Sequence, residues 1–261
     1  MTIKMRDFTL EKYEEICRVV KKNYPVVTFD KYLNMSKRKL VILRHDVDRL
    51  PKNALNMAKL EHDLGLKATY YFRTKKSSFQ PEIIKKIASL GHEIGYHYES
   101  LDQAKGDRRK AIKFFERDLG RLRKLFPVKT ICMHGNPLSK FDNRDLWQKY
   151  NYQDYDILAE AYLSLRDNVA YFSDTGRTWD NQYKVKDHLV HSTIRKENIK
   201  VKTSDDLIRL IGLQRIDQIC ILSHPERWNN NLIWWSGYFV IDKLVQVIKK
   251  VKISHENIAG N

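Results

Sequence analysis

The sequence has few of the residues that mark fibrous, linker-like or disulfide-built proteins. Its 261 residues include 10 glycines and 6 prolines, which excludes a collagen-like chain, a Gly/Ser linker and a proline-rich segment. Its 3 cysteines, Cys17, Cys132 and Cys220, lie far apart and form no CxxC pair. Neither a disulfide scaffold nor a zinc knuckle is therefore expected, and the cysteine usage indicates a reducing, cytoplasmic setting.

Long apolar runs are also missing. No stretch approaches the roughly 18 apolar residues that a membrane helix needs, and acids interrupt the N-terminal region, which does not resemble a secretory signal. With 42% hydrophobic residues the chain can still bury a core. No glycine-rich linker divides it. We expect one domain over residues 1–261, in which residues 1–40 form an N-terminal helical cap.

Acidic residues are fewer than basic residues. The 48 Lys and Arg against 32 Asp and Glu give a net charge of +16, which suits nucleic acid, an anionic membrane surface or an anionic substrate. The densest basic stretch, Lys105–Lys129, has apolar residues at helical spacing, so we interpret it as the solvated face of an amphipathic helix. No zinc-finger spacing, RNA-binding run or basic coiled coil accompanies the charge, and no specific nucleic-acid partner is expected.

Strand-like and helix-like segments alternate along most of the chain. Such alternation predicts parallel strands joined by helical crossovers, which is an α/β fold. The first strand is not followed by GxGxxG or by a phosphate-binding loop, and polar residues end many of the strands. This favours a barrel with its site at the carboxyl ends over an open doubly wound sheet. The expected strands are 41–48, 68–73, 93–99, 130–135, 156–162, 169–173 and 218–223, and the expected helices are 10–23, 51–64, 81–90, 204–213 with Ser204 as its N-cap, and 238–251.

Chemically active side chains follow or end these strands. Residues two apart in a strand face the same side, so the first two acids point together, as do the histidine and glutamate of the third strand. Carboxylates and imidazoles that meet at one rim suit a divalent metal and leave acid and base groups to spare. In chain order these residues are Asp46, Asp48, His97, Glu99, His134, Asp174 and His224.

Three short motifs stand at these strand ends: HDVD, GHEIGYH and ILSH. In this order they resemble the polysaccharide deacetylases, the NodB-homology family also called carbohydrate esterase family 4. The resemblance runs from about Val41 to about Trp228. It implies a distorted (β/α)7-type barrel, TIM-like, with parallel strands. It also implies a metal-dependent hydrolase that removes an N-acetyl or O-acetyl group from a sugar.

The resemblance also assigns roles to single residues. Asp46 takes the position of the general base and His224 that of the general acid, while Asp48 and His97 take metal-binding positions. Val47 separates two acids that the family has side by side, so an exchange of roles between Asp46 and Asp48 stays open.

One family position is substituted. The second metal-binding histidine of the family falls on Leu101, which cannot coordinate a metal. His134 is the preferred replacement because it offers the same imidazole group, and Glu99 is the alternative ligand. The expected cofactor is a divalent metal, with zinc as the first choice.

Aromatic and polar residues suggest the substrate side of the site. The segment SDTGRTW places Asp174, Arg177 and Trp179 where the family has residues around its pocket, and we expect them to support or contact the substrate. Trp179 and Trp228 are candidates for stacking on a sugar ring. The expected substrate is an acetylated sugar of a polysaccharide or glycolipid precursor, which is anionic if it is linked to a nucleotide or a lipid.

Two alternatives remain beside the deacetylase. A catalytically degenerate barrel that binds carbohydrate or a partner is favoured by Leu101. A barrel hydrolase acting on a non-sugar amide or formyl group would use the same metal chemistry. The sequence makes no prediction of the oligomeric state.

Overall fold

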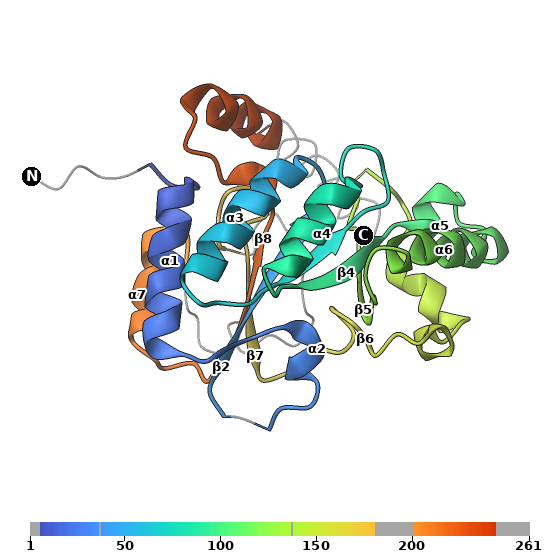
Figure 1. The fold of residues 1–261 in the computed structure, drawn as a ribbon, viewed down its shortest axis with the longest axis horizontal. Helices are drawn as coiled ribbons and strands as arrows, with labels where there is room; N and C mark the ends of the chain where they lie inside the picture. Colours follow the sequence, from blue (N-terminus) through green and yellow to red (C-terminus); the bar gives the residue numbers. More distant parts are fainter. Residues whose placement is uncertain (1–5, 37, 137, 181–200, 244–261) are drawn as a thin grey trace, which may run out of the picture.

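The fold is built around one parallel sheet (Figure 1). The computed structural model describes residues 6–36, 38–136, 138–180 and 201–243. The strand order is β6-β5-β4-β3-β2-β8-β7, and β1 pairs with β2 beside this path. The strands are β1 (Val26–Val27), β2 (Leu40–Val47), β3 (Thr69–Phe72), β4 (Glu93–Tyr98), β5 (Thr130–Met133), β6 (Ala159–Glu160), β7 (Val169–Ser173) and β8 (Gln218–Ser223).

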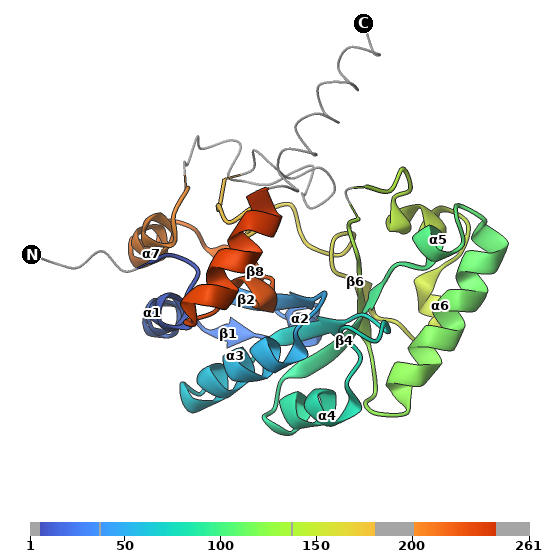
Figure 2. The ribbon, with the colours of Figure 1, turned by 90° about the horizontal axis from the view of Figure 1, so that it is seen from above.

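Helices pack on the outer side of this sheet, which is curled into a half-barrel (Figure 2). All the strand pairs are parallel, so the carboxyl ends of the strands lie at one end of the half-barrel. The expected α/β class and distorted parallel barrel are confirmed, and β6 and β7 are the two edges of the sheet. The helices are α1 (Leu10–Asn23), α2 (Phe29–Tyr32), α3 (Pro51–Asp63), α4 (Pro81–Ser89), α5 (Ser100–Gln103), α6 (Arg108–Arg123) and α7 (Ser204–Gly212).

Local sequence sets the limits of the helices. Proline occupies the first turn of α3 and of α4, where its missing N–H costs no hydrogen bond. Gly65 and Gly91 follow these helices with φ of +70° and +89°, a conformation that glycine adopts without strain. The expected N-cap of α7 is corrected by one residue. The Thr203 side chain accepts a hydrogen bond from the N–H of Asp206, and the Asp206 carboxylate accepts one from Thr203 in return.

Strand β2 carries different chemistry on its two faces. His45 of β2 points outward, where its Nε2 lies 2.7 Å from Glu61 of α3. The Glu61 carboxylate also accepts hydrogen bonds from the hydroxyls of Tyr13 at 2.5 Å and Tyr70 at 2.7 Å. Arg44 and Asp46, on either side of His45, point into the half-barrel. The buried outer network ties α1 and α3 to β2 and β3.

The expected elements exist with small shifts at their ends. The strand expected over 156–162 is reduced to the two residues of β6, while β1, α2 and α5 were not expected. The closing helix expected over 238–251 begins at residue 232, and its part beyond residue 243 lies outside the described residues. Among the helices that the structure describes, none has the length and apolarity needed to cross a bilayer.

Candidate metal and acid–base site

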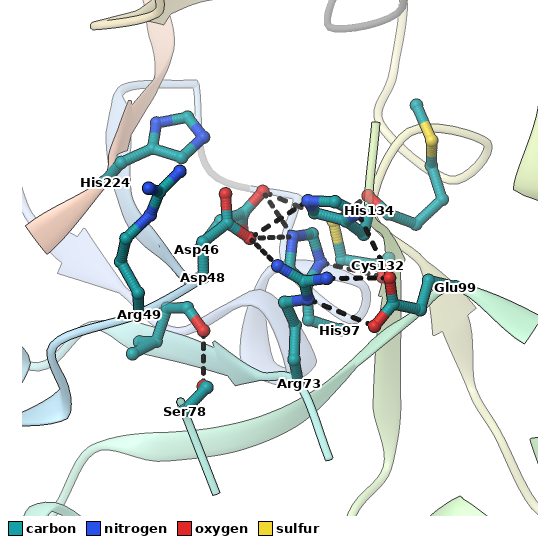
Figure 3. A network of polar contacts seen from close by, with 12 residues as sticks. Asp46, Asp48, Arg49, Arg73, Ser78, His97, Glu99, Cys132, His134 and His224 are labelled. Atoms are coloured by element: carbon teal, nitrogen blue, oxygen red, sulfur yellow. Dashed lines mark hydrogen bonds and ion pairs between the residues drawn. The ribbon is translucent and has the colours of Figure 1, made fainter. Parts of the chain in front are cut away.

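The candidate site lies at the carboxyl ends of the strands, where side chains from several strands meet (Figure 3). Asp46 is the penultimate residue of β2 and Asp48 follows its end, so strand alternation sends both carboxylates into the half-barrel. His97 comes from β4, and His134 directly follows β5. The backbone N–H of His134 donates to the carbonyl of Tyr98 at 2.7 Å, which holds the two imidazole-bearing segments side by side.

Three of the predicted metal-binding residues come together. Asp48 Oδ1 lies 3.3 Å from His97 Nε2 and 3.4 Å from His134 Nε2. Zinc bonds of about 2.0–2.1 Å in a tetrahedron place neighbouring ligand atoms about 3.3 Å apart, so both distances match that spacing. Asp48 Oδ1 is also buried without a hydrogen bond from any described residue. A carboxylate oxygen in that position, faced by two imidazole nitrogens, fits a divalent cation.

Neighbouring groups orient both histidines. His97 Nδ1 lies 3.0 Å from the carbonyl oxygen of Cys132, which can only accept a hydrogen bond. Nδ1 therefore carries a proton, and Nε2 is the ring nitrogen that faces Asp48. On the other side, His134 Nδ1 lies 3.6 Å from Glu99 Oε2. Glu99, predicted as the alternative ligand, thus lies behind His134.

Arg73 and Lys75 hold Glu99 in this place. Arg73 donates to both Glu99 oxygens at 3.2 and 2.7 Å, and Lys75 Nζ lies 3.0 Å from Oε2. Burial raises the pKa of Glu99, but these cations outweigh burial and the net pKa is lowered. For Asp48, burial likewise raises the pKa, while His134 and His97 lower it well below its usual range. Both carboxylates are therefore ionised near neutral pH.

A second group of potential donors lies deeper in the half-barrel. Ligand atoms of Asp46, His97 and Cys132 lie within 4.8 Å of one another. A cation already occupies this position, because Arg44 donates to the two Asp46 oxygens at 3.0 and 2.7 Å and its Nη2 lies 2.6 Å from Cys132 Sγ. The residues that could hold a metal are therefore Asp48, His97 and His134, and Asp46 lies outside this set.

The remaining predicted catalytic residue, His224, follows β8 and is fixed by Asp174, which follows β7. His224 Nδ1 lies 2.6 Å from Asp174 Oδ1, and the N–H of His224 donates to Asp174 Oδ2 at 2.9 Å. Burial and Arg227 lower the pKa of His224, but Asp174 outweighs them and the net pKa is raised. The pKa of Asp174 falls to about 2 because Arg227 and His224 outweigh burial. This ion pair favours a protonated imidazole.

The residues expected to contact the substrate have structural roles instead. Trp228 Nε1 donates to Asp174 Oδ2 at 2.8 Å, and Trp179 Nε1 donates to Ser204 Oγ at 3.0 Å. Both rings are only 2% exposed and pack with Phe8, so neither offers a face to a sugar. Arg177 pairs with Asp242 at 2.8 Å. Of this set, only Asp174 touches a proposed catalytic residue.

Sequence reasoning missed the arginines of the site. Arg44 directly precedes HDVD, and Arg73 directly follows β3, so both stand where strand alternation or a strand end would bring them to the site. Arg227 donates to Asp174 at 2.8 Å. Leu101 is buried in α5, and its N–H donates to Asn143 Oδ1 at 3.0 Å. It contributes to the core.

Glu226 is a further buried carboxyl group near the site. It lies in the short helix η4 (Pro225–Arg227), and its Oε1 is 3.6 Å from Arg49 Nε. Burial and the charge of Asp48 raise the pKa of Glu226 to about 7. Near neutral pH this group is therefore partly protonated and can donate as well as accept a hydrogen bond.

Comparisons with known proteins find similarity in structure only. No protein-family model matches the sequence, and no curated protein matches it. A family 4 carbohydrate esterase from Streptomyces lividans in complex with acetate is 12% identical, with a TM-score of 0.41 over 82% of this chain and 91% of that one. A peptidoglycan N-acetylglucosamine deacetylase is 19% identical, with a TM-score of 0.41 over 83% of this chain and 84% of its own.

A pseudoenzyme is also among the similar structures. This CE4-family pseudoenzyme from Bacillus anthracis is 13% identical, with a TM-score of 0.41 over 81% of this chain. The chain spans less than two thirds of that protein, namely 61% of its length.

Proposed function

We propose that this protein is a metal-dependent deacetylase that hydrolyses an N-acetyl or O-acetyl group on a sugar. The observation that carries the proposal is the convergence of Asp48, His97 and His134 at 3.3 and 3.4 Å. Beside this trio lie a carboxylate outside the ligand set, Asp46, and a histidine paired with an acid, His224. The motifs HDVD, GHEIGYH and ILSH provide independent support.

Each group has one chemical task in this proposal. Asp48, His97 and His134 would hold a divalent metal, which would supply polarisation of the acyl carbonyl and activation of water at neutral pH. Asp46 accepts the proton of the attacking water, and Arg44 orients its carboxylate through two hydrogen bonds. His224 donates a proton to the departing nitrogen or oxygen, and Asp174 keeps that proton available. The acid and the base are thus separate residues.

The surroundings favour an anionic substrate. Arg49 and Lys75 stand near the site with half-exposed side chains, and the chain carries a net charge of +16. Basic groups around a site raise the local concentration of an anionic ligand. A sugar carried on a nucleotide or lipid phosphate in the cytoplasm, where the reduced cysteines are expected, matches this charge.

The test measures metal content and hydrolysis in the same preparations. We expect one equivalent of zinc in the wild type and a loss of metal in Asp48→Ala and His97→Ala, because each removes one of three protein ligands. His62→Ala is the matched control, since His62 is exposed on α3 away from the trio. Acetate release from acetylated amino sugars should follow the metal. Full metal content in both ligand variants would overturn the proposal.

A non-catalytic carbohydrate-binding barrel is the second candidate, favoured by Leu101. Its side chain is buried in the core, so the position offers no ligand. Zinc-loaded protein that binds acetylated sugar oligomers but releases no acetate would favour this alternative. Substrates with formyl or non-sugar amide groups belong in the same screen.

A further inference from the structure

Among the described residues, an apolar surface on the helical segment of residues 232–243 is left exposed beside the site. Ile233 is 81% exposed and Trp234 is 57% exposed. At 100° per residue, Ile233, Val240 and Ile241 fall on one side of the helix with Gly237, and Trp234 borders them. We call this set the apolar face: Ile233, Trp234, Val240 and Ile241.

The opposite side of the segment is anchored to the barrel. Trp235 and Phe239 stack with ring centroids 5.2 Å apart, and the Arg177 guanidinium lies 5.0 Å from the Trp235 ring. Asp242 pairs with Arg177 at 2.8 Å and lies 3.7 Å from Arg227. The segment is therefore fixed through its inner side, and the apolar face is held outward in one orientation. Figure 1 shows the helix standing beyond the end of β8, close to the start of α3.

Charge identifies the kind of surface that fits this face. Asp242 is the one acid in 232–243, and two arginines neutralise it. Lys243 ends the described part of the segment, and exposed Arg49 lies 6.0 Å from the ring of Tyr238. The sequence that follows continues with apolar residues and with Lys249, Lys250 and Lys252. Two copies that each carry +16 would repel one another, whereas an anionic lipid surface would attract this chain.

We propose that the apolar face docks on the surface of an anionic lipid bilayer, with the helix lying in the plane of the interface. Apolar residues and tryptophan on one side, together with basic residues, are the features of helices that bind in this way. The helix follows η4, which begins next to His224, so docking places the candidate site close to the membrane surface. The docking itself does not depend on the proposed deacetylase activity. The idea that the substrate is a lipid-linked sugar would rest on both the docking and the proposed deacetylase activity.

The experiment is flotation of the full chain with unilamellar vesicles of phosphatidylcholine, with and without phosphatidylglycerol. We expect the wild type to float with the mixed vesicles, more at low than at physiological ionic strength. The triple variant Ile233→Ser, Trp234→Ser, Ile241→Ser should bind at least about tenfold less, because it removes most of the exposed apolar area. The matched control is Leu158→Ser with Leu213→Ser, two leucines that are each 52% exposed outside this helix.

Spectroscopic and scattering measurements accompany the flotation experiment. Tryptophan emission of the wild type should shift to the blue with mixed vesicles, and Trp234→Phe should lose most of that shift. Circular dichroism checks that the variants are folded, and light scattering reports the oligomeric state. The proposal is overturned if the wild type stays with the lipid-free fraction at low ionic strength. It is equally overturned if the triple variant floats like the control, or if the face instead mediates a dimer that the triple variant abolishes.

Discussion

Asp46 and Asp48 lie two residues apart on one side of the chain, yet their surroundings differ. Asp46 is bonded through both oxygens to the buried guanidinium of Arg44, whereas Asp48 faces two imidazoles. Arg44 already supplies a cation to both Asp46 oxygens, whereas the imidazole nitrogens at 3.3 and 3.4 Å from Asp48 could join it as ligands of a metal. On this difference, and not on their order in the sequence, we propose Asp46 as the base and Asp48 as the ligand.

The pair of Arg44 and Asp46 leads to a prediction about stability. Arg44→Met removes the cation and leaves the Asp46 carboxylate buried alone, which should lower the free energy of unfolding by about 3–5 kcal/mol. Denaturant unfolding measures this loss. Adding Asp46→Leu should restore much of the stability, because the unpaired charge is gone. Arg38→Met is the control on an exposed ion pair with Asp217, and it should change little. Equal effects of Arg44→Met and Arg38→Met would contradict the prediction.

The pair of Asp174 and His224 leads to a prediction about pH. His224 must be protonated to act as an acid, so the rate should fall as pH rises through its raised pKa. In Asp174→Asn the imidazolium loses its carboxylate, and the pKa of His224 should drop. The alkaline limb of the rate profile should then move to lower pH. Asp217→Asn is the surface control. A uniform loss of rate with no shift of the limb would indicate a merely structural role for Asp174.

At the scale of elements, β2 carries two polar groups on opposite faces. Arg44 and Asp46 point into the half-barrel, and His45 points toward α1 and α3, where it meets Glu61. The two-residue period of a strand separates these groups. The inner group belongs to the site, and the outer group fixes the helices that pack behind β2. One short sequence, Arg-His-Asp, thus serves both function and packing.

Glu61 gives the prediction at this scale. Its buried carboxylate joins α3 to α1 and β3 through Tyr13 and Tyr70, so Glu61→Gln should lower the free energy of unfolding by about 3–5 kcal/mol at neutral pH. Burial raises the pKa of Glu61, but His45 and its other partners outweigh burial and the net pKa is lowered. Its contribution is therefore present above the unfolded pKa of about 4.3 and is lost as pH falls through the lower folded value.

Unfolding experiments at several pH values test this contribution. The difference in stability between the wild type and Glu61→Gln should shrink on acidification. Glu14→Gln is the control, because Glu14 pairs with Arg18 on the surface of α1. A difference that stays constant from neutral to acidic pH would show that the charge of Glu61 is not what stabilises the network.

Most elements could be predicted because their signals are local. The alternation of strand-like and helix-like segments predicted the strands. A proline in the first turn and a glycine after the end predicted α3 and α4. The convergence of Asp48, His97 and His134 also followed, since parallel strands bring their carboxyl ends together. The role of Arg44 could not be foreseen, because its contact with Cys132 spans 88 positions. The prediction that Trp179 and Trp228 stack on a sugar was wrong, because both rings are buried. Burial is decided by tertiary packing, which composition does not reveal.

At the scale of the whole molecule, the parallel sheet places its chemistry at one end. The metal candidates come from the ends of β2, β4 and β5, and the acid pair comes from the ends of β7 and β8. These strands are distant in sequence but adjacent or nearly adjacent in the sheet. A metal bound by residues from three strands crosslinks the centre of the fold, so its binding energy adds to the stability of the entire chain.

Thermal unfolding with and without zinc therefore tests the assignment of the ligands. At a free zinc concentration about 100 times its dissociation constant, binding adds about 2.7 kcal/mol, which corresponds to a rise in Tm of about 5–10 °C for a chain of this size. The wild type and His62→Ala should both show this rise. The double variant Asp48→Ala, His97→Ala should show little, because one imidazole remains from the trio. His134→Ala separates the two sets of donors: its response to zinc should be lost if His134 is a ligand and kept if the metal binds Asp46, His97 and Cys132 instead. Calorimetric scans on apo-protein prepared with a chelator, which is then removed, give the answer without any substrate.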